Sequence, residues 1–218
     1  MNTLYTPQQR ELQEKFDTSR IAGLIEQALV HPALTVQDKG FIGSRDMFFL
    51  STVDGSGQPT VSYKGGAPGF VRVVDDATLA FPCYDGNGMF LSMGNIAATA
   101  KVGLLFIDFE TPHRLRVQGT AEIREDDPLM DEFPEALFIV RVGVAQIFIN
   151  CPRYIHQKTA ATPSKYVPRA GVETPVPGWK RIDVVQPALA AKDQGRAQAA
   201  GGLISFPEYE AALLRGEG

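Results

Sequence analysis

Two short segments of the chain combine residue types that suit the binding of an anion. The first is Ser-Tyr-Lys-Gly-Gly at residues 62–66, and the second is Asp-Gly-Asn-Gly at residues 85–88. A lysine at a strand end, beside glycines whose amides can face a ligand, suits a phosphate group, and Ser62 adds a hydroxyl donor. An exposed strand end with a glycine pair fits residues 62–66 equally well, so the spacing alone leaves both interpretations open.

The second segment offers an anion a different kind of contact. Gly86 and Gly88 permit close approach of the backbone, and a helix predicted over residues 86–100 would present free N–H groups at its start. Met89 and further apolar residues follow directly. An ordinary turn with a helix cap is the alternative interpretation, and this segment taken by itself favours it.

Several other motifs point away from common catalytic chemistries. Gly55-Ser56-Gly57 indicates a hairpin turn rather than a dinucleotide loop, because Thr60 stands where the third glycine belongs and no helix follows. The three histidines, at positions 31, 113 and 156, share no metal-ligand spacing. The sequence has no HExxH motif, no nucleophile-elbow serine and no paired-carboxylate pattern. It therefore assigns no catalytic residue and no metal ligand.

A last cluster of functional residue types is Cys151-Pro152-Arg153-Tyr154. Arg153 suits an anion or an interface, whereas no base partner can be identified for Cys151 as a nucleophile. Cys83 and Cys151 are expected to be reduced thiols, since two cysteines supply neither a disulfide framework nor a four-ligand zinc site. Trp179 is expected at an interface or in a core.

The hydrophobic periodicity predicts helices at the N-terminus and strands after them. Residues 1–45 read as helical, with Pro7 in a first turn and His31 before a proline that ends the second helix. Seven strands are predicted, at residues 47–53, 59–64, 70–74, 78–81, 101–108, 114–124 and 136–149. Because most of them have no crossover helix between them, the pattern favours a mainly β fold, an antiparallel barrel with flanking helices.

Composition and charge exclude several function classes. The 218 residues include 21 lysines and arginines against 25 aspartates and glutamates, which gives a net charge of −4. This mild acidity does not indicate nucleic-acid binding, which requires concentrated positive charge. Hydrophobic residues make up 44% of the chain, enough for a core. No apolar run approaches the ~20 residues that cross a bilayer, and the N-terminus lacks a signal-peptide pattern. We expect a cytoplasmic protein that binds neither nucleic acid nor membrane.

A run of motifs extends over about residues 40–155, namely FFLSTVD, GSGQPTVSYKGG, PGFVRV, GN, NI, KVGLLFIDF and LRVQGTAEI, and NCPRYIH continues it. In this order they resemble the pyridoxamine 5′-phosphate oxidase-related, FMN-binding proteins. The resemblance implies a split β-barrel and a homodimer with FMN in two symmetric interface clefts. We expect a helical segment at residues 1–45, a flavin-binding domain at 46–150, and a C-terminal arm with a short helix at 151–218, which packs on the barrel or the partner.

The resemblance also implies which residues approach the cofactor. The flavin ring would lie along the first strand, at Phe49, Leu50, Ser51 and Thr52. The phosphate would lie near Ser62, Tyr63, Lys64 and Gly65, and the cofactor would be covered by Asn87, Gly88 and Met89. Arg114 and Arg116 would reach the cofactor of the partner. The oxidases are rich in arginine and lysine where this chain has DGNGM, so Lys64 and backbone amides must supply more of the attraction.

The function that follows is an FMN-dependent oxidoreductase acting on a small molecule stacked on the flavin. The chain ends in LLRGEG rather than the Arg-Leu-Ala-Pro tail of the oxidases, so pyridoxamine phosphate is not the expected substrate. A flavin performs the redox chemistry itself, so the lack of an acid–base pair does not separate an enzyme from a carrier. Two alternatives stay open: a non-catalytic flavin-binding protein for storage or sensing, and a relative that binds deazaflavin or haem in the same cleft.

Overall fold

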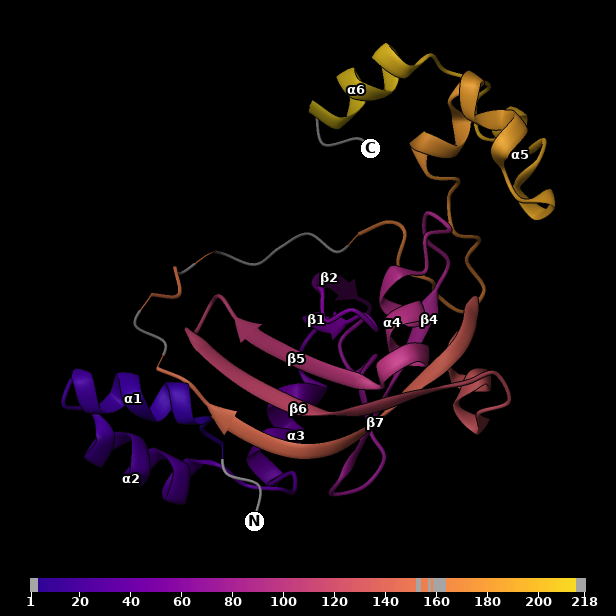
Figure 1. Ribbon diagram of the computed structural model, residues 1–218. Helices are drawn as coiled ribbons and strands as arrows, with labels where there is room; N and C mark the ends of the chain where they lie inside the picture. The colour runs from indigo at the N-terminus through magenta and orange to yellow at the C-terminus, as the bar shows by residue number, and fades with distance from the viewer. Residues whose placement is uncertain (1–3, 152–153, 157, 159–163, 215–218) are drawn as a thin grey trace. The chain divides into compact units, whose positions relative to one another are not determined.

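The computed structural model describes residues 4–151, 154–156, 158 and 164–214 (Figure 1). The chain divides into two compact units, residues 1–162 and residues 163–218. The first unit contains the sheet and the helices that precede it, and the second contains short helical turns. Each unit is described by itself below.

Three helices precede the sheet, as the sequence predicts: α1 (Pro7–Lys15), α2 (Ser19–Leu29) and α3 (Val36–Gly43). α1 begins at a capping box in which Thr6 accepts from the Gln9 amide and the Gln9 side chain accepts from the Thr6 amide. A second capping box, between Thr35 and Asp38, begins α3. His31 lies between α2 and α3, where its backbone forms an isolated bridge to Ile147 in the sheet.

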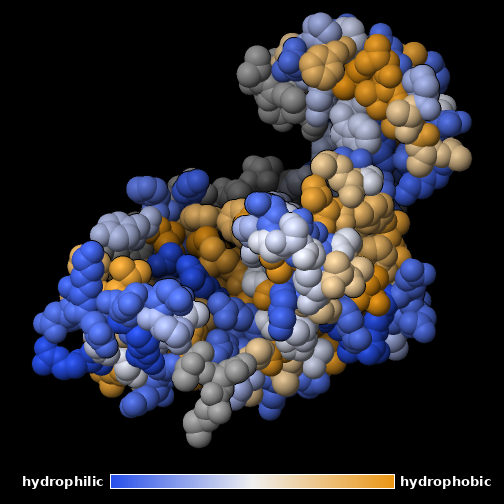
Figure 2. All heavy atoms as spheres, viewed as in Figure 1, coloured by the Kyte–Doolittle hydropathy of each residue, from blue (hydrophilic) through white to orange (hydrophobic). Residues whose placement is uncertain are grey.

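The α1–α2 hairpin exposes several large apolar side chains. Leu12, Phe16 and Leu24 are 56%, 68% and 59% exposed. An ion pair between Arg10 and Glu26 joins the two helices. Figure 2 shows hydrophobic residues interspersed among hydrophilic ones over this hairpin, at the lower left.

The sheet has seven antiparallel strands in the order β2-β1-β5-β6-β7-β4-β3, which confirms the predicted mainly β, antiparallel class. The strands are β1 (Met47–Val53), β2 (Pro59–Gly65), β3 (Arg72–Val73), β4 (Thr78–Tyr84), β5 (Lys101–Asp108), β6 (His113–Arg124) and β7 (Ala136–Ile149). β3 is shorter than the predicted strand at 70–74, because a turn in which the Phe70 amide donates to the Ala67 carbonyl at 2.9 Å precedes it.

The sheet curves into a barrel that does not close. The long strands β6 and β7 bend in Figure 1, and a bulge between Gln118 and Gly119 lies in their ladder. β2 is one end of the strand order and β4 with β3 is the other, and no ladder between these ends occurs among the described strands. Side chains of β2 and β4 nevertheless line the same cavities, so the two ends face each other across a split.

The core inside the curved sheet is built on aromatic side chains. Phe48, Phe81 and Phe106 are fully buried, and the ring centroid of Phe48 lies 5.0 Å from that of Phe81 and 5.3 Å from that of Phe106. Burying one such side chain stabilises a protein by about 1.5–3 kcal/mol. These rings come from β1, β4 and β5, so they hold both ends of the sheet to its centre.

A single α-helix, α4 (Leu91–Thr99), connects β4 to β5. The helix predicted over 86–100 therefore begins five residues late, and residues 86–90 form a loop. Phe90, which precedes the helix, has a left-handed backbone with φ of 49°, which bulky residues rarely adopt. The helix is attached to β1, because Asn95 Nδ2 donates to Thr52 Oγ1 at 3.1 Å and Thr99 Oγ1 donates to the Val53 carbonyl at 2.8 Å.

The second unit contains short helices: η2 (Gly178–Arg181), η3 (Asp183–Ala188), η4 (Ala191–Asp193), α5 (Arg196–Ala199) and α6 (Phe206–Leu214). Its centre holds a buried ion pair, with Lys180 Nζ 2.9 Å from Asp193 Oδ2. Trp179 is half-buried beside this pair, with the Lys180 ammonium 5.5 Å from its ring centroid. α6 begins at a capping box between Ser205 and Glu208, with the Ser205 amide donating to Glu208 at 2.7 Å.

Candidate functional site

A cavity of about 270 Å³ lies at the split between β2, β4 and the start of α4. Thr60, Ser62 and Lys64 occupy alternate positions on β2, so their side chains share the face that lines it. The loop between β4 and α4 covers another side. The lining residues are Thr60, Val61, Ser62, Lys64, Cys83, Tyr84, Gly86, Asn87, Gly88, Met89, Phe90, Leu91, Ser92 and Met93.

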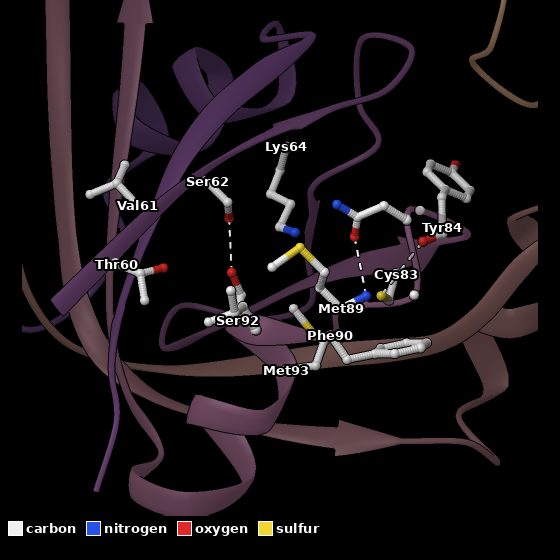
Figure 3. A pocket seen from close by; sticks show the side chains of 14 residues that line it. Thr60, Val61, Ser62, Lys64, Cys83, Tyr84, Met89, Phe90, Ser92 and Met93 are labelled. Carbon is white, nitrogen blue, oxygen red and sulfur yellow. Dashed lines mark hydrogen bonds between the residues drawn. The ribbon is translucent and has the colours of Figure 1, made fainter. Parts of the chain in front are cut away.

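Lys64 supplies the charge of this cavity. Its ammonium group extends into the cavity towards Met89 (Figure 3), and no other charged side chain of the described residues lines it. The side chain is half-buried, and burial lowers the pKa of its ammonium group, while the nearby Cys83 thiol opposes that shift. Burial therefore disfavours the charged form, which gains from an anionic ligand.

Two serine hydroxyls complete the polar side of the cavity. Ser62 Oγ and Ser92 Oγ lie 3.0 Å apart, and Figure 3 shows the bond between them running from β2 to α4. Ser92 is the second residue of α4, so it lies beside the helix N-terminus, where backbone N–H groups lack intrahelical acceptors. A cation, hydroxyl groups and a helix start therefore meet within one cavity.

Asn87 and its neighbours shape the loop that borders the cavity. Asn87 Oδ1 accepts from the Met89 amide at 3.1 Å, which turns the chain towards α4. Gly88 has a φ of 78°, which suits a glycine. Met89, Phe90 and Leu91 are 64%, 49% and 50% exposed, so an apolar lip borders the cavity.

Cys83 lies between this cavity and a second one of about 240 Å³. Tyr63 and Gly65 line the second cavity, and Lys64 lines both. Burial raises the pKa of the Cys83 thiol, the neighbouring Lys64 opposes this, and Asp85 adds to it. The thiol is free and buried, as expected for a reduced cysteine.

The four residues predicted on the first strand lie elsewhere. Leu50 is fully buried in the core, and Thr52 is buried in its bond to Asn95. Phe49 packs edge-on against Tyr63, with centroids 6.1 Å apart. Ser51 lines another cavity, of about 580 Å³, with Thr52. β1 pairs with both β2 and β5 along this stretch, so its backbone groups are engaged in the sheet.

Arg114 and Arg116 lie on β6 and line neither cavity of this chain. Arg114 Nη2 donates to the Cys151 carbonyl at 2.7 Å, and Arg116 is exposed. Cys151 is exposed, and Arg153 lies outside the described residues. The structure thus brings together five of the predicted site residues in the first cavity: Ser62, Lys64, Asn87, Gly88 and Met89.

Nine lining residues were not among the predicted set: Thr60, Val61, Cys83, Tyr84, Gly86, Phe90, Leu91, Ser92 and Met93. Thr60 lies on the same face of the strand as Ser62 and Lys64, so the two-residue period of a strand could have predicted that it lines the same cavity. Ser92 and Cys83 come from segments whose approach to β2 depends on the curvature of the sheet, and no local pattern marks them.

The part of the chain that the structure describes contains no group of three or more histidine, cysteine, aspartate or glutamate side chains placed to hold a metal ion. The histidine with a close acidic partner is His31, whose Nε2 lies 2.8 Å from Asp38 Oδ2. Across the same residues, no helix has the length and apolar character that a membrane crossing requires.

A family model described as pyridoxamine 5′-phosphate oxidase matches residues 34–164, which is more than half of the chain. The chain therefore belongs to the pyridoxamine 5′-phosphate oxidase family. The matched region runs from the approach to α3 past β7 and includes every residue that lines the cavity at the split. A search of curated proteins gives no match.

Several solved structures are similar to the sheet region. HupZ of Group A Streptococcus is 24% identical over 53% of this chain and 93% of its own, with a TM-score of 0.44. An FMN-binding protein of Syntrophomonas wolfei is 12% identical over 65% and 96%, with a TM-score of 0.41. The haem storage protein HutZ of Vibrio cholerae is 19% identical over 52% and 92%, with a TM-score of 0.40. With these scores below 0.5, family membership rests on the family model.

Proposed function

We propose that the protein binds FMN with its phosphate group at Lys64, Ser62 and Ser92. The observation that carries this proposal is the half-buried Lys64 ammonium, which faces a cavity lined by no carboxylate of the described chain. The two hydroxyls and the start of α4 offer hydrogen bonds to phosphate oxygens. Gly65 and Gly88 border the same region and let backbone approach the ligand.

The remaining predicted residues have supporting roles in this proposal. Met89 and the two apolar residues after it cover the ring or its edge. Phe49, Leu50, Ser51 and Thr52 form the strand that fixes β2 in place, and Tyr63 borders the second cavity. FMN supplies the redox chemistry when it is bound, and the chain binds it, orients it and limits water around it. We propose an oxidoreductase acting on a small molecule, with pyridoxamine phosphate not its substrate.

We also propose that a second copy of the chain completes the site. A cavity of about 270 Å³ is at the small end of ligand pockets, so one chain alone leaves much of a flavin uncovered. Val61 and Tyr63 on the outer strand β2 are 67% and 62% exposed, which suits burial against a partner. In such a homodimer, Arg114 and Arg116 of each chain approach the cofactor held by the other.

The proposal divides the chain by role, with a helical segment at 1–45, the flavin-binding domain at 46–150 and an arm at 151–218. It places the protein in the cytoplasm.

The alternative is a flavin carrier for storage or sensing. The lack of an acid–base pair among the described lining residues does not separate a carrier from an enzyme, because a bound flavin performs the redox chemistry itself. Deazaflavin or haem in the same cavity is the further alternative.

The test compares two ligands that differ only in the phosphate. Purified full-length protein is titrated with FMN and with riboflavin, and flavin fluorescence reports binding. FMN is expected to bind at least about tenfold more tightly, since charge-assisted hydrogen bonds contribute about 1.5–3 kcal/mol. Equal affinities, or no binding of either flavin, would contradict the proposal. Reduction of the bound flavin by NAD(P)H, followed by reoxidation with an acceptor, separates an enzyme from a carrier.

A further inference from the structure

Lys64 combines three properties that suit a reactive amine. Its amine reaches a cavity (Figure 3), no carboxylate of the described residues lines that cavity, and the side chain is half-buried. Burial lowers the pKa of this ammonium group, so a larger fraction is the neutral amine at a given pH. A neutral lysine amine is a nucleophile for carbonyl carbon.

The hydroxyl pair provides the proton transfers that such a reaction requires. Ser62 Oγ and Ser92 Oγ share one hydrogen bond at 3.0 Å, so one of the two hydroxyl protons remains to be donated. Ser92 is buried at 6% exposure, and Ser62 is partly buried. Both hydroxyls line the cavity into which the amine extends.

We propose that, in the absence of flavin, Lys64 is a covalent capture site for small apolar aldehydes, with which it forms a reversible imine. The Nζ lone pair forms a bond to the carbonyl carbon as the C=O π bond breaks, and a proton leaves the nitrogen as one reaches the oxygen, which gives a carbinolamine. The carbinolamine then loses its hydroxyl group with one proton as water, leaving the imine. Hydrolysis reverses the sequence, so neither an oxidant nor a reductant is consumed.

The lining selects the aldehyde by polarity and size. Met89, Leu91 and Met93 present thioether and aliphatic groups, and about 270 Å³ admits one small ring. Once the Lys64 amine has reacted, the described lining residues include no second cation that could bind an acidic substituent of the aldehyde. An uncharged aromatic aldehyde is therefore the expected ligand class. Imine formation and phosphate binding use the same nitrogen, so an aldehyde and a flavin exclude each other.

The experiment uses the full-length protein with benzaldehyde and sodium cyanoborohydride at neutral pH, followed by peptide mass spectrometry. The reductant traps each imine as a stable secondary amine, and exposed Lys101 is the internal reference. Lys64 is expected to be labelled severalfold faster than Lys101, because burial favours its neutral amine. The ratio of the labelling rate of Lys64 to that of Lys101 is expected to be larger with benzaldehyde than with glycolaldehyde, which is polar. A Ser92→Ala variant is expected to slow the labelling of Lys64 severalfold and to leave that of Lys101 unchanged.

Labelling of Lys64 at or below the rate of Lys101 overturns the proposal. A ratio of the two labelling rates that is no larger with benzaldehyde than with glycolaldehyde also overturns it. Saturating FMN separates this proposal from that of flavin binding. Fast labelling that FMN suppresses supports both proposals. Fast labelling that FMN leaves unchanged supports aldehyde capture and contradicts the phosphate site at Lys64. Slow labelling of the flavin-free protein, with FMN still bound more tightly than riboflavin, overturns aldehyde capture alone.

Discussion

Single residues decide the chemistry at the split in the sheet. Lys64 and Ser62 are identified from sequence, because a lysine and a serine two residues apart before a glycine pair form a local pattern. Ser92 and Cys83 cannot be identified that way, since they reach Lys64 only after β4 and α4 are folded against β2. Functional residues that are neighbours in sequence can thus be predicted from the sequence, whereas those that come together from different strands are found only in the structure.

Replacing Lys64 tests its role in holding the phosphate. Lys64→Ala is expected to weaken FMN binding by about 1.5–3 kcal/mol, roughly tenfold to hundredfold in Kd, because a charged hydrogen bond is lost. Riboflavin, which has no phosphate, is expected to bind the variant as it binds the original chain. Fluorescence titration measures both, with Lys101→Ala as the control for loss of one positive charge. An unchanged preference for FMN would remove Lys64 from the phosphate site.

Gly119 is required for the bulge between β6 and β7. A Cβ atom at this position would lie 2.1 Å from the carbonyl oxygen of Gly143, which is backbone and cannot rotate away. Gly119→Ala is therefore expected to destabilise the protein by about 1–3 kcal/mol or more, measured by urea denaturation. Gly55→Ala is the matched control, since a Cβ there meets nothing within 4 Å. Equal stability of the two variants would contradict this account.

At the scale of elements, α4 shows where local patterns mislead. Residues 86–100 have the composition of a helix, yet residues 86–90 form a loop and Phe90 adopts a left-handed backbone. The helix begins where Met93 and Ile96 can be buried and where Asn95 can reach β1. Tertiary contacts therefore set the start of this helix, and sequence alone could not place it.

The bond from Asn95 to Thr52 is expected to fix α4 against the sheet. Both side chains are buried, at 7% and 3% exposure. Asn95→Ala is expected to cost about 1–3 kcal/mol in free energy of unfolding, because the Thr52 hydroxyl loses a buried partner. Urea denaturation is the measurement, with exposed Ala98→Ser on the same helix as the control. A loss no greater than that of the control would show that the bond contributes little.

Asp127 links the turn η1 (Pro128–Glu132) to β7 and is expected to make stability depend on pH. Its buried carboxylate accepts from Arg141 and from the Leu129 amide, and the bond from Arg141 is the main cause that lowers the pKa of Asp127. The stabilisation is complete above the ordinary aspartate pKa of about 3.9 and is lost as pH falls through the lower pKa of the folded state.

The variant Asp127→Asn tests this dependence. It is expected to be less stable than the original protein at pH 7, and the difference is expected to shrink as pH falls below about 4. Chemical denaturation at several pH values measures it, with exposed Asp126→Asn as the control. A stability difference that stays constant from pH 7 to pH 2.5 would contradict the assignment.

At the scale of the whole molecule, strand patterns predict the class of fold but not its closure. The predicted bounds of β1, β5 and β7 agree with the structure, since these strands have long apolar runs. The pairing of β7 with β4 joins segments separated by α4, β5 and β6, and no turn motif indicates it. The split, and with it the cavity, follows from that distant pairing and from the curvature at Gly119.

A second copy of the chain is expected in solution. Sedimentation is expected to give twice the 23.7 kDa of one chain. Replacing both Val61 and Tyr63 by lysine is expected to shift the protein to monomer, because charges cannot be buried at the proposed interface. Leu24→Lys on α2 is the control at another exposed apolar residue. A monomeric original protein that binds FMN tightly would contradict the dimer.

The break between β2 and β4 also has a mechanical consequence. A closed barrel fixes its diameter through backbone hydrogen bonds, whereas side chains alone set the span across this break. Widening the gap between β2 and β4 breaks no hydrogen bond between paired strands. The resistance of the gap to widening depends on the size of the side chains that touch across it. Exchanging those side chains changes the thickness of molecule that the protein admits, while the rest of the sheet keeps its stability.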